Sequence, residues 1–189
     1  KRVADLCTRM ERRGLLVDGT YVEQNLMPWL DQLEAEGAAE AKEYGVDNVN
    51  STAQVAAALS GLGWVPEEFT AGGKPKVDKS VLTELAEAGN PVAAAVQKAK
   101  RAGKWRVTYA VPMLEDVDSL GRIHPRINAL QARTARMSVA KPPLQQLPSN
   151  DWRVRRAIIA DPGKTLWAAD YAQIEMRVLA AMAGEVNMQ

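Results

Sequence analysis

Asp170, near the C-terminal end of the sequence, stands where a carboxylate could hold a cation. Asp170 follows the apolar run 166–169, which predicts a short buried strand, and helical periodicity begins after it with Ile174 and Val178. Asp170 is therefore expected at a strand-to-helix junction, with Glu175 one helical turn further on. A carboxylate at that junction is a hard oxygen ligand of the kind that Mg²⁺ prefers. From the residues alone, the commoner alternatives are a helix-capping Asp170 and a solvated Glu175.

Basic residues are concentrated in one part of this chain of 189 residues, whose net charge is only +1. Segment 97–156 contains thirteen Lys or Arg and four Asp or Glu, whereas residues 1–96 contain nine and fifteen. Segregation of this kind is expected of a protein that faces a polyanion, but solvated helix faces also produce it. Charge alone therefore favours nucleic acid and plain solvated surface equally.

The first part of the chain, residues 1–117, is expected to be mainly helical. Apolar residues recur at helical spacing before Gly14, where a left-handed residue would end the first helix. Segment 61–79 has no period and contains several Gly and Pro, so we expect a loop there. The other helix starts are marked by capping residues or proline: Asp18 or Thr20, Asn50-Ser51-Thr52, and Asn90-Pro91. The helix after Asn90 is expected to run toward Leu114 and to carry Lys100, Lys104 and Arg106.

Residues 118–189 have a different character, because short extended segments replace the helical pattern. Strands are expected at about 122–124, 126–130 and 133–139, and Asp151 can cap a short basic helix that follows them. The sequence therefore predicts an α+β fold, in which a mainly helical part precedes a small sheet.

Composition narrows the class of protein further. The single cysteine, Cys7, lies on an apolar helical pattern and cannot form an internal disulfide, so we read it as core filler in a reducing environment. No run of residues is long and apolar enough to predict a membrane span, and the start does not have the order of a secretory signal. We expect a cytoplasmic protein with no membrane partner. Both ends lack natural start or stop features, so we expect the chain to be a piece of a longer one.

Segment 170–177, Asp-Tyr-Ala-Gln-Ile-Glu-Met-Arg, closely resembles the first catalytic motif of family A DNA polymerases, the bacterial DNA polymerase I group. That motif usually reads Asp-Tyr-Ser-Gln-Ile-Glu-Leu-Arg. Segment 134–138, Thr-Ala-Arg-Met-Ser, is similar to the family's Thr-Gly-Arg-Leu-Ser element, and segment 144–148, Leu-Gln-Gln-Leu-Pro, to its Leu-Gln-Asn-Ile-Pro element. Further matches occur in the same order back to Arg9, so the resemblance covers nearly the whole chain.

The resemblance implies a subdomain for each part of the chain. Residues 1–117 would form the helical, DNA-gripping thumb, with 1–18 as the segment next to the palm. Residues 118–189 would form the N-terminal half of the antiparallel-sheet palm, up to and just past the first catalytic motif. The fingers and the remaining palm of the same polymerase would then be partners of this chain.

The resemblance also implies roles for the acidic motif in template-directed DNA synthesis. Asp170 would be a catalytic ligand of two Mg²⁺ ions that assist phosphoryl transfer, with the Tyr171 backbone carbonyl as a second contact. Glu175 would lie against the sugar of the incoming deoxyribonucleoside triphosphate and exclude a 2′-hydroxyl. Gln173 would help to orient this nucleotide site. Because Asp170 alone cannot hold two metal ions, we expect the chain to be inactive by itself.

Primer-template DNA is the other implied partner. Lys100, Lys104 and Arg106 would contact phosphates along the duplex, and such contacts carry no sequence information. The helix start at Asn50, Ser51 and Thr52 could meet a phosphate with its exposed N–H groups, although plain capping explains these residues equally well. In the minor groove, we expect the primer end to be contacted by Arg136, Gln145 and Gln146.

Two readings from other classes remain. A non-catalytic duplex DNA-binding module, derived from a polymerase thumb and palm, would keep the basic helix but lose the chemistry. The intact Asp170 and Glu175 argue against it. A helical interaction protein with no nucleic-acid role is disfavoured by the charge segregation, and weak salt dependence of DNA binding would revive it.

Overall fold

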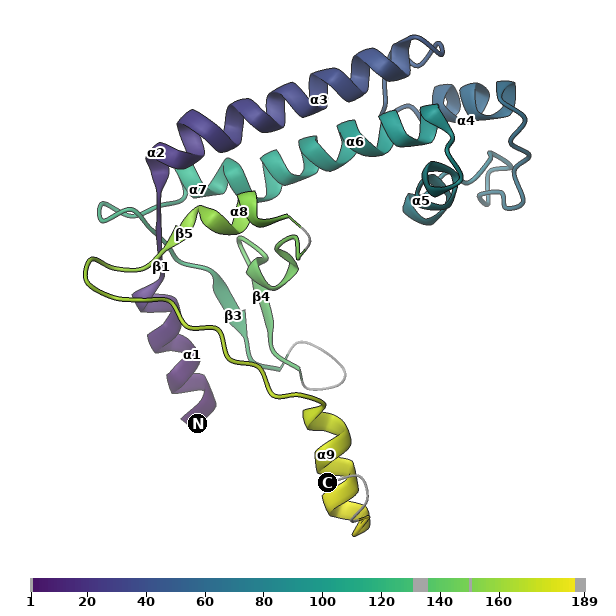
Figure 1. Ribbon diagram of the computed structural model, residues 1–189. Coiled ribbons are helices and arrows are strands. Elements are labelled where there is room, and N and C mark those ends of the chain that lie inside the picture. Colours follow the sequence, from purple (N-terminus) through teal and green to yellow (C-terminus); the bar gives the residue numbers. More distant parts are fainter. Residues whose placement is uncertain (1, 131–135, 150, 186–189) are drawn as a thin grey trace. The chain divides into compact units, whose positions relative to one another are not determined.

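The computed structural model describes residues 2–130, 136–149 and 151–185 and divides the chain into two compact units, 1–159 and 160–189. The first combines long helices with short antiparallel strands, which confirms the α+β fold class (Figure 1). Its helices are α1 (Arg2–Arg13), α2 (Gly19–Tyr21), α3 (Met27–Lys42), α4 (Thr52–Gly61), α5 (Lys79–Glu87), α6 (Pro91–Trp105), α7 (Pro112–Glu115) and α8 (Trp152–Arg156).

The helix starts lie where the capping residues predicted them. The side chains of Asp18, Ser51, Asn90 and Asp151 each accept a hydrogen bond from a backbone N–H in the first turn that follows. Gly14 ends α1 with a left-handed φ of +61°, as the sequence predicted. These ends are specified by local chemistry, because each cap satisfies N–H groups that the helix itself leaves unpaired.

Helices α3 and α6 lie side by side and antiparallel along the length of the first unit (Figure 1). Small residues allow this close packing: a Cβ atom on Gly37 of α3 would lie only 2.7 Å from the backbone nitrogen of Ala99 in α6. A π-helical turn, Arg106–Ala110, continues α6 into α7, so the helix predicted from Asn90 toward Leu114 is confirmed. Two apolar cores are built on this pair of helices. Their largest buried side chains are Leu26, Leu30, Met113 and Ile123 in one, and Val46, Val55, Leu59, Val92 and Val96 in the other.

The first unit also contains two small antiparallel sheets. In the first, β1 (Leu15–Val17) lies between β2 (Arg122–Ile123) and β5 (Ile158–Ile159), so the N-terminal segment joins the sheet. In the second, β3 (Arg126–Asn128) pairs with β4 (Ser138–Ala140). The described strands are shorter than the sequence predicted, and residues 131–135 of the expected third strand lie outside the described residues. The subdomain boundary at 117/118 stays a prediction.

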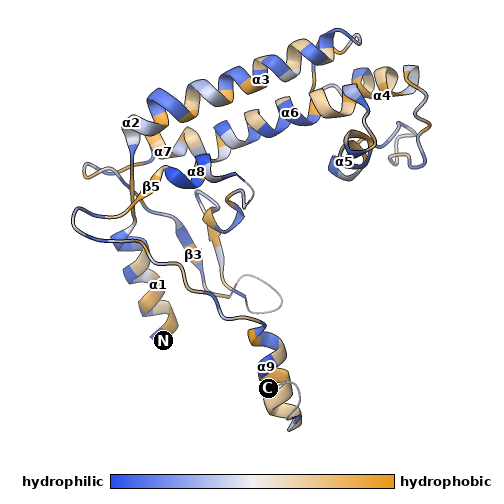
Figure 2. Ribbon diagram, in the orientation of Figure 1, coloured by the Kyte–Doolittle hydropathy of each residue, from blue (hydrophilic) through white to orange (hydrophobic). Residues whose placement is uncertain are grey.

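The second unit contains α9 (Ile174–Ala183), and it corrects the strand expected at 166–169. Segment 166–169 is not a strand, and Trp167 is 91% exposed, because the described residues give it no neighbouring strand to pair with. Asp170 does not cap α9: the capping position is Gln173, which has a left-handed φ of 53° and makes no side-chain cap. Most of α9 is apolar yet exposed, and its ribbon is largely in hydrophobic colours in Figure 2.

Candidate functional site

Four of the residues predicted to bind nucleic acid line one cleft of about 230 Å³, which we call the basic cleft: Asn50, Lys100, Lys104 and Arg106. Lys100 and Lys104 are four residues apart, so successive turns of α6 present them on one face. Asn50 comes from the segment before α4. The fold therefore brings together residues that are about fifty positions apart in the sequence.

Lys100 and Lys104 are the cations of the basic cleft that the described residues leave without an ion pair. Partial burial lowers the pKa of Lys100, because desolvation disfavours the charged form. Arg106 differs, since its Nε donates a hydrogen bond of 2.8 Å to Asp31 of α3. Glu34 also lines the cleft, but among the described residues it forms no ion pair with either lysine, so an approaching anion would stabilise both ammonium groups.

A second cleft, of about 580 Å³, lies between α5 and α6 and shares both lysines with the first. Lys79, Arg101 and Trp105 also line it, and the Arg101 guanidinium lies 5.4 Å from the centre of the Trp105 ring. The sequence reading did not select these three residues as binding residues. One signal for the pair was present, because Arg101 and Trp105 have the i, i+4 spacing of neighbours on a helix face.

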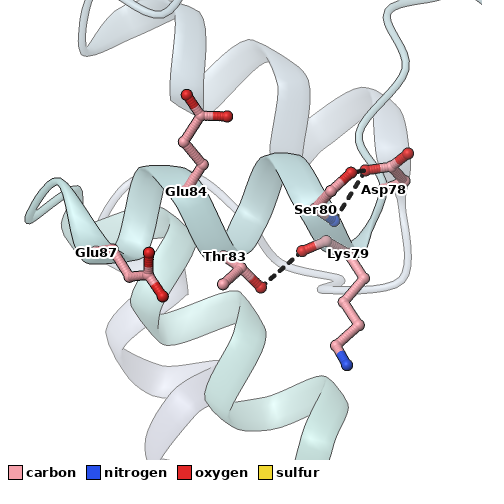
Figure 3. Close-up of a pocket in the computed structure, with 6 residues that line it drawn as sticks. All are labelled: Asp78, Lys79, Ser80, Thr83, Glu84 and Glu87. Atoms are coloured by element: carbon pink, nitrogen blue, oxygen red, sulfur yellow. Dashed lines mark hydrogen bonds between the residues drawn. The ribbon is translucent and has the colours of Figure 1, made fainter. Parts of the chain in front are cut away.

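Helix α5 also borders an acidic hollow (Figure 3). Asp78 caps the helix, and hydrogen bonds from the Ser80 hydroxyl and the Val81 N–H lower its pKa to about 2. The side chains of Glu84 and Glu87 line the same hollow. Lys79 also lines the hollow and Asp78 also lines the second cleft, so the hollow differs from that cleft in its two glutamates, which would repel a phosphate.

The segment before α4 has a clear structural role. Ser51 uses its hydroxyl to cap the helix by accepting from the Gln54 N–H at 3.4 Å. Asn50 donates its backbone N–H to the Asn48 side chain and also lines the basic cleft. Thr52 is the exposed first residue of α4. Capping therefore accounts for Ser51, while Asn50 is the member of the trio that the fold brings to Lys100 and Lys104.

The three residues predicted at the primer end lie near β4. Arg136 and Gln146 are exposed, and the Gln146 backbone carbonyl accepts a 2.7 Å hydrogen bond from the buried Tyr109 hydroxyl. Gln145 is also exposed, but its amide oxygen accepts from the Val139 N–H at 3.1 Å and its amide nitrogen donates to the Met137 carbonyl at 3.3 Å. Thr134 and Ala135 of the same element lie outside the described residues.

In the second unit, the acidic motif forms an exposed turn before α9. The side chains of Asp170 and Glu175 both reach solvent, and Tyr171 is 79% exposed. Arg177 donates from Nε to the Ala172 carbonyl at 3.0 Å, which ties the turn to the first turn of the helix. The turn is therefore stabilised from α9, and the Asp170 carboxylate is left available for an external ligand.

The donor set at Asp170 fits a hard divalent cation in part. A carboxylate and the following Tyr171 carbonyl are oxygen ligands of the type that Mg²⁺ takes. Within residues 2–130, 136–149 and 151–185, no three His, Cys, Asp or Glu side chains are close enough together to hold a metal ion. Two metal ions would thus need ligands in addition to those that the described residues provide.

Within the described part of the chain, no helix is both long enough and apolar enough to cross a bilayer.

Comparison with known proteins finds that the chain is similar to DNA polymerases. The chain is 41% identical over 190 residues to the DNA polymerase of Mycobacterium phage D29 and 42% identical over 187 residues to that of phage L5, and in each case 99% of the chain is covered. It is also 34% identical to DNA polymerase I of Chloroflexus aurantiacus. The chain spans only 31% of each phage polymerase and 20% of the Chloroflexus enzyme.

A solved structure is similar over 95% of this chain and 33% of its own length, with a TM-score of 0.78 and 29% sequence identity. It is the POL domain of Pol1 from M. smegmatis in complex with DNA primer-template and dNTP. The sequence model described as DNA polymerase family A matches residues 21–189. Since that match includes most of the chain, the chain belongs to DNA polymerase family A.

Proposed function

We propose that this chain supplies the thumb and the first half of the palm of a DNA-directed DNA polymerase, which adds deoxyribonucleotides to a primer 3′ end. The observation that carries the proposal is the basic cleft, which Asn50 lines together with Lys100 and Lys104, two cations that form no ion pair within the described residues. The similarity to a polymerase solved with primer-template and dNTP supports it. Fingers and the remaining palm would come from the rest of the polymerase, so the chain alone would not polymerise.

Duplex DNA would bind along α6 through its phosphates. Lys100 and Lys104 line both clefts, and Lys100 is partly desolvated, so its ammonium group would gain more from a phosphate than a fully hydrated one. Arg106 would add a contact whose position is held by Asp31. Contacts of this kind grip any sequence, as a replicating or repairing polymerase requires.

Catalysis would depend on Asp170. Bound Mg²⁺ would neutralise charge that develops on the attacking 3′ oxygen and on the leaving pyrophosphate. Asp170 and the Tyr171 carbonyl would hold the ion, and Gln173 would orient the nucleotide. The free carboxylate supports this role, because Asp170 is not used as a helix cap.

Glu175, in the first turn of α9, would exclude a ribose 2′-hydroxyl. The ratio of ribonucleotide to deoxyribonucleotide incorporation tests this role.

Charge reversal tests the DNA-binding part of the proposal. Lys100→Glu combined with Lys104→Glu should weaken duplex binding and lower the slope of log affinity against log salt by about 2, one for each lost phosphate contact. Lys42→Glu combined with Lys74→Glu makes the same charge change at exposed positions outside both clefts and is the matched control. Equal binding isotherms for the two double variants would show that α6 does not lie along the duplex.

A non-catalytic DNA-binding module is the alternative. It predicts the same salt dependence, but no template-directed synthesis after reassembly with the remaining polymerase segments. Synthesis in that reaction would exclude it.

A further inference from the structure

Among the described residues, β3 and β4 form a two-stranded sheet, so each strand has an outer edge whose backbone groups are not paired with another strand. Ile127 and Val139 are opposite each other in the register. In an antiparallel pair, opposite residues alternate between those that bond each other and those whose N–H groups point outward. Here both N–H groups are bonded elsewhere, which identifies the outward-pointing arrangement.

Side chains close both outer edges. On the β3 side, the Ile127 N–H donates to the Glu11 carboxylate of α1. On the β4 side, the Val139 N–H donates to Gln145 Oε1, while Gln145 Nε2 donates to the Met137 carbonyl. A side-chain amide that bonds a carbonyl and the N–H two residues later takes the place of the N–H and C=O that one residue of a third strand would present. Gln145 therefore has the position of a strand residue opposite Ser138.

The segment that Gln145 holds begins directly after Arg136. Met137 is fixed a second time, because its sulfur lies 3.8 Å from Cys7 Sγ of α1. Ser138 and Val139 are paired with β3. Backbone on one side of Arg136 is thus held by β3, by α1 and by Gln145, whereas the Arg136 side chain itself is exposed.

We propose that Gln145 is a positioning residue, which fixes the backbone that carries Arg136, and is not itself a contact to DNA. The inference rests on the proposed function, in which Arg136 reaches the primer end in the minor groove. It revises the role predicted for Gln145, because the amide oxygen and one amide hydrogen that would bind a base edge are already used by β4. Arg136 and the exposed Gln146 remain the candidates for the contact.

The first test needs no DNA. Gln145→Met keeps the length of the side chain but removes both hydrogen bonds, so the Val139 amide should exchange with solvent at least about tenfold faster in the 189-residue chain. Gln24→Met, at an exposed position away from the hairpin, is the control and should leave Val139 exchange unchanged. Unchanged exchange in Gln145→Met would overturn the inference, whatever the chain does with DNA.

The second test is a double-mutant cycle on primer-template affinity. Arg136→Ala should weaken binding about tenfold and Gln145→Met about three- to tenfold, but Gln145→Met should have less than about a twofold effect when Arg136 is already Ala. A direct contact or a general loss of structure would instead give effects that multiply, which would overturn the inference while leaving the proposed function intact. If the wild-type chain shows no salt-sensitive affinity for primer-template, the proposed function fails, and the inference fails with it.

Discussion

Replacing Gly37 by alanine should force α3 and α6 apart. A Cβ atom at this position would lie 2.7 Å from the Ala99 nitrogen, 2.8 Å from the Ala95 carbonyl oxygen and 3.0 Å from the Ala99 Cβ. The closest of these are backbone atoms of α6, which cannot rotate away as a flexible side chain would. To reach the 3.4 Å of ordinary contact, the helices must separate by about 0.7 Å, the difference between 3.4 and 2.7 Å.

The expected cost combines two opposing terms. Overpacking of this kind costs about 1–3 kcal/mol, and the better helix propensity of alanine returns up to about 1 kcal/mol. Gly61→Ala is the matched control, since Gly61 ends α4 with nothing within 4 Å of its Cβ position and has no left-handed φ. The two variants make the same chemical change, so the difference between their free energies of unfolding isolates the clash at about 1–3 kcal/mol.

Urea unfolding of the chain followed by circular dichroism measures this difference. We expect Gly37→Ala to have the lower midpoint with an unchanged slope, because the same surface is exposed on unfolding. If Gly37→Ala is as stable as Gly61→Ala, then the two helices do not pack as closely as the structure has them. The arrangement of Lys100, Lys104 and Asn50 around one cleft would then be in question as well.

Two further predictions concern pH and sugar selection. The hydrogen bond between Asp118 and His124, 3.0 Å long, lowers the pKa of the carboxyl and raises the pKa of the imidazole. The carboxylate stabilises the fold above its unfolded pKa of about 3.9, and this contribution is lost as the pH falls through its lowered folded pKa. The imidazolium stabilises the fold below its unfolded pKa of about 6.5, and this contribution is lost as the pH rises through its raised folded pKa. Asp118→Asn should therefore lower the urea midpoint more at pH 5.5 than at pH 8.5, and equal losses at the two values would contradict this reading. In the reassembled polymerase, Glu175→Ala should raise ribonucleotide incorporation relative to deoxyribonucleotide by about tenfold or more, which competition primer extension measures, and an unchanged ratio would remove the selective role from Glu175.

Local signals explain which parts of the fold could be predicted from the sequence. Asp18, Ser51, Asn90 and Asp151 cap helices because a short polar side chain reaches N–H groups two or three residues away, whatever the rest of the chain does. Gly14 ends α1 for a similarly local reason. Strands depend on partners, and segment 166–169 was wrongly predicted as a strand because an apolar run does not reveal whether a neighbour is present.

For the candidate DNA site, the sequence suggested residues but could not show how the fold arranges them. Lys100 and Lys104 share a face by helical spacing alone, but their meeting with Asn50 depends on how α4 and α6 pack. The ion pair of Arg106 with Asp31 joins two helices and left no mark in the sequence. Gln145 was predicted as a DNA contact from its motif, while its two bonds to β4 could be seen only once the hairpin register was known.

Primer extension by the reassembled polymerase is the measurement that tests the central claim most directly. The chain would be combined with the remaining fingers and palm segments, primer-template and Mg²⁺, as wild type and as Asp170→Asn. We predict template-directed synthesis with the wild-type chain, a loss of at least about a thousandfold with Asp170→Asn, and similar duplex affinity for both. Synthesis that persists in Asp170→Asn would contradict the assignment of Asp170 as the metal-holding carboxylate of the polymerase.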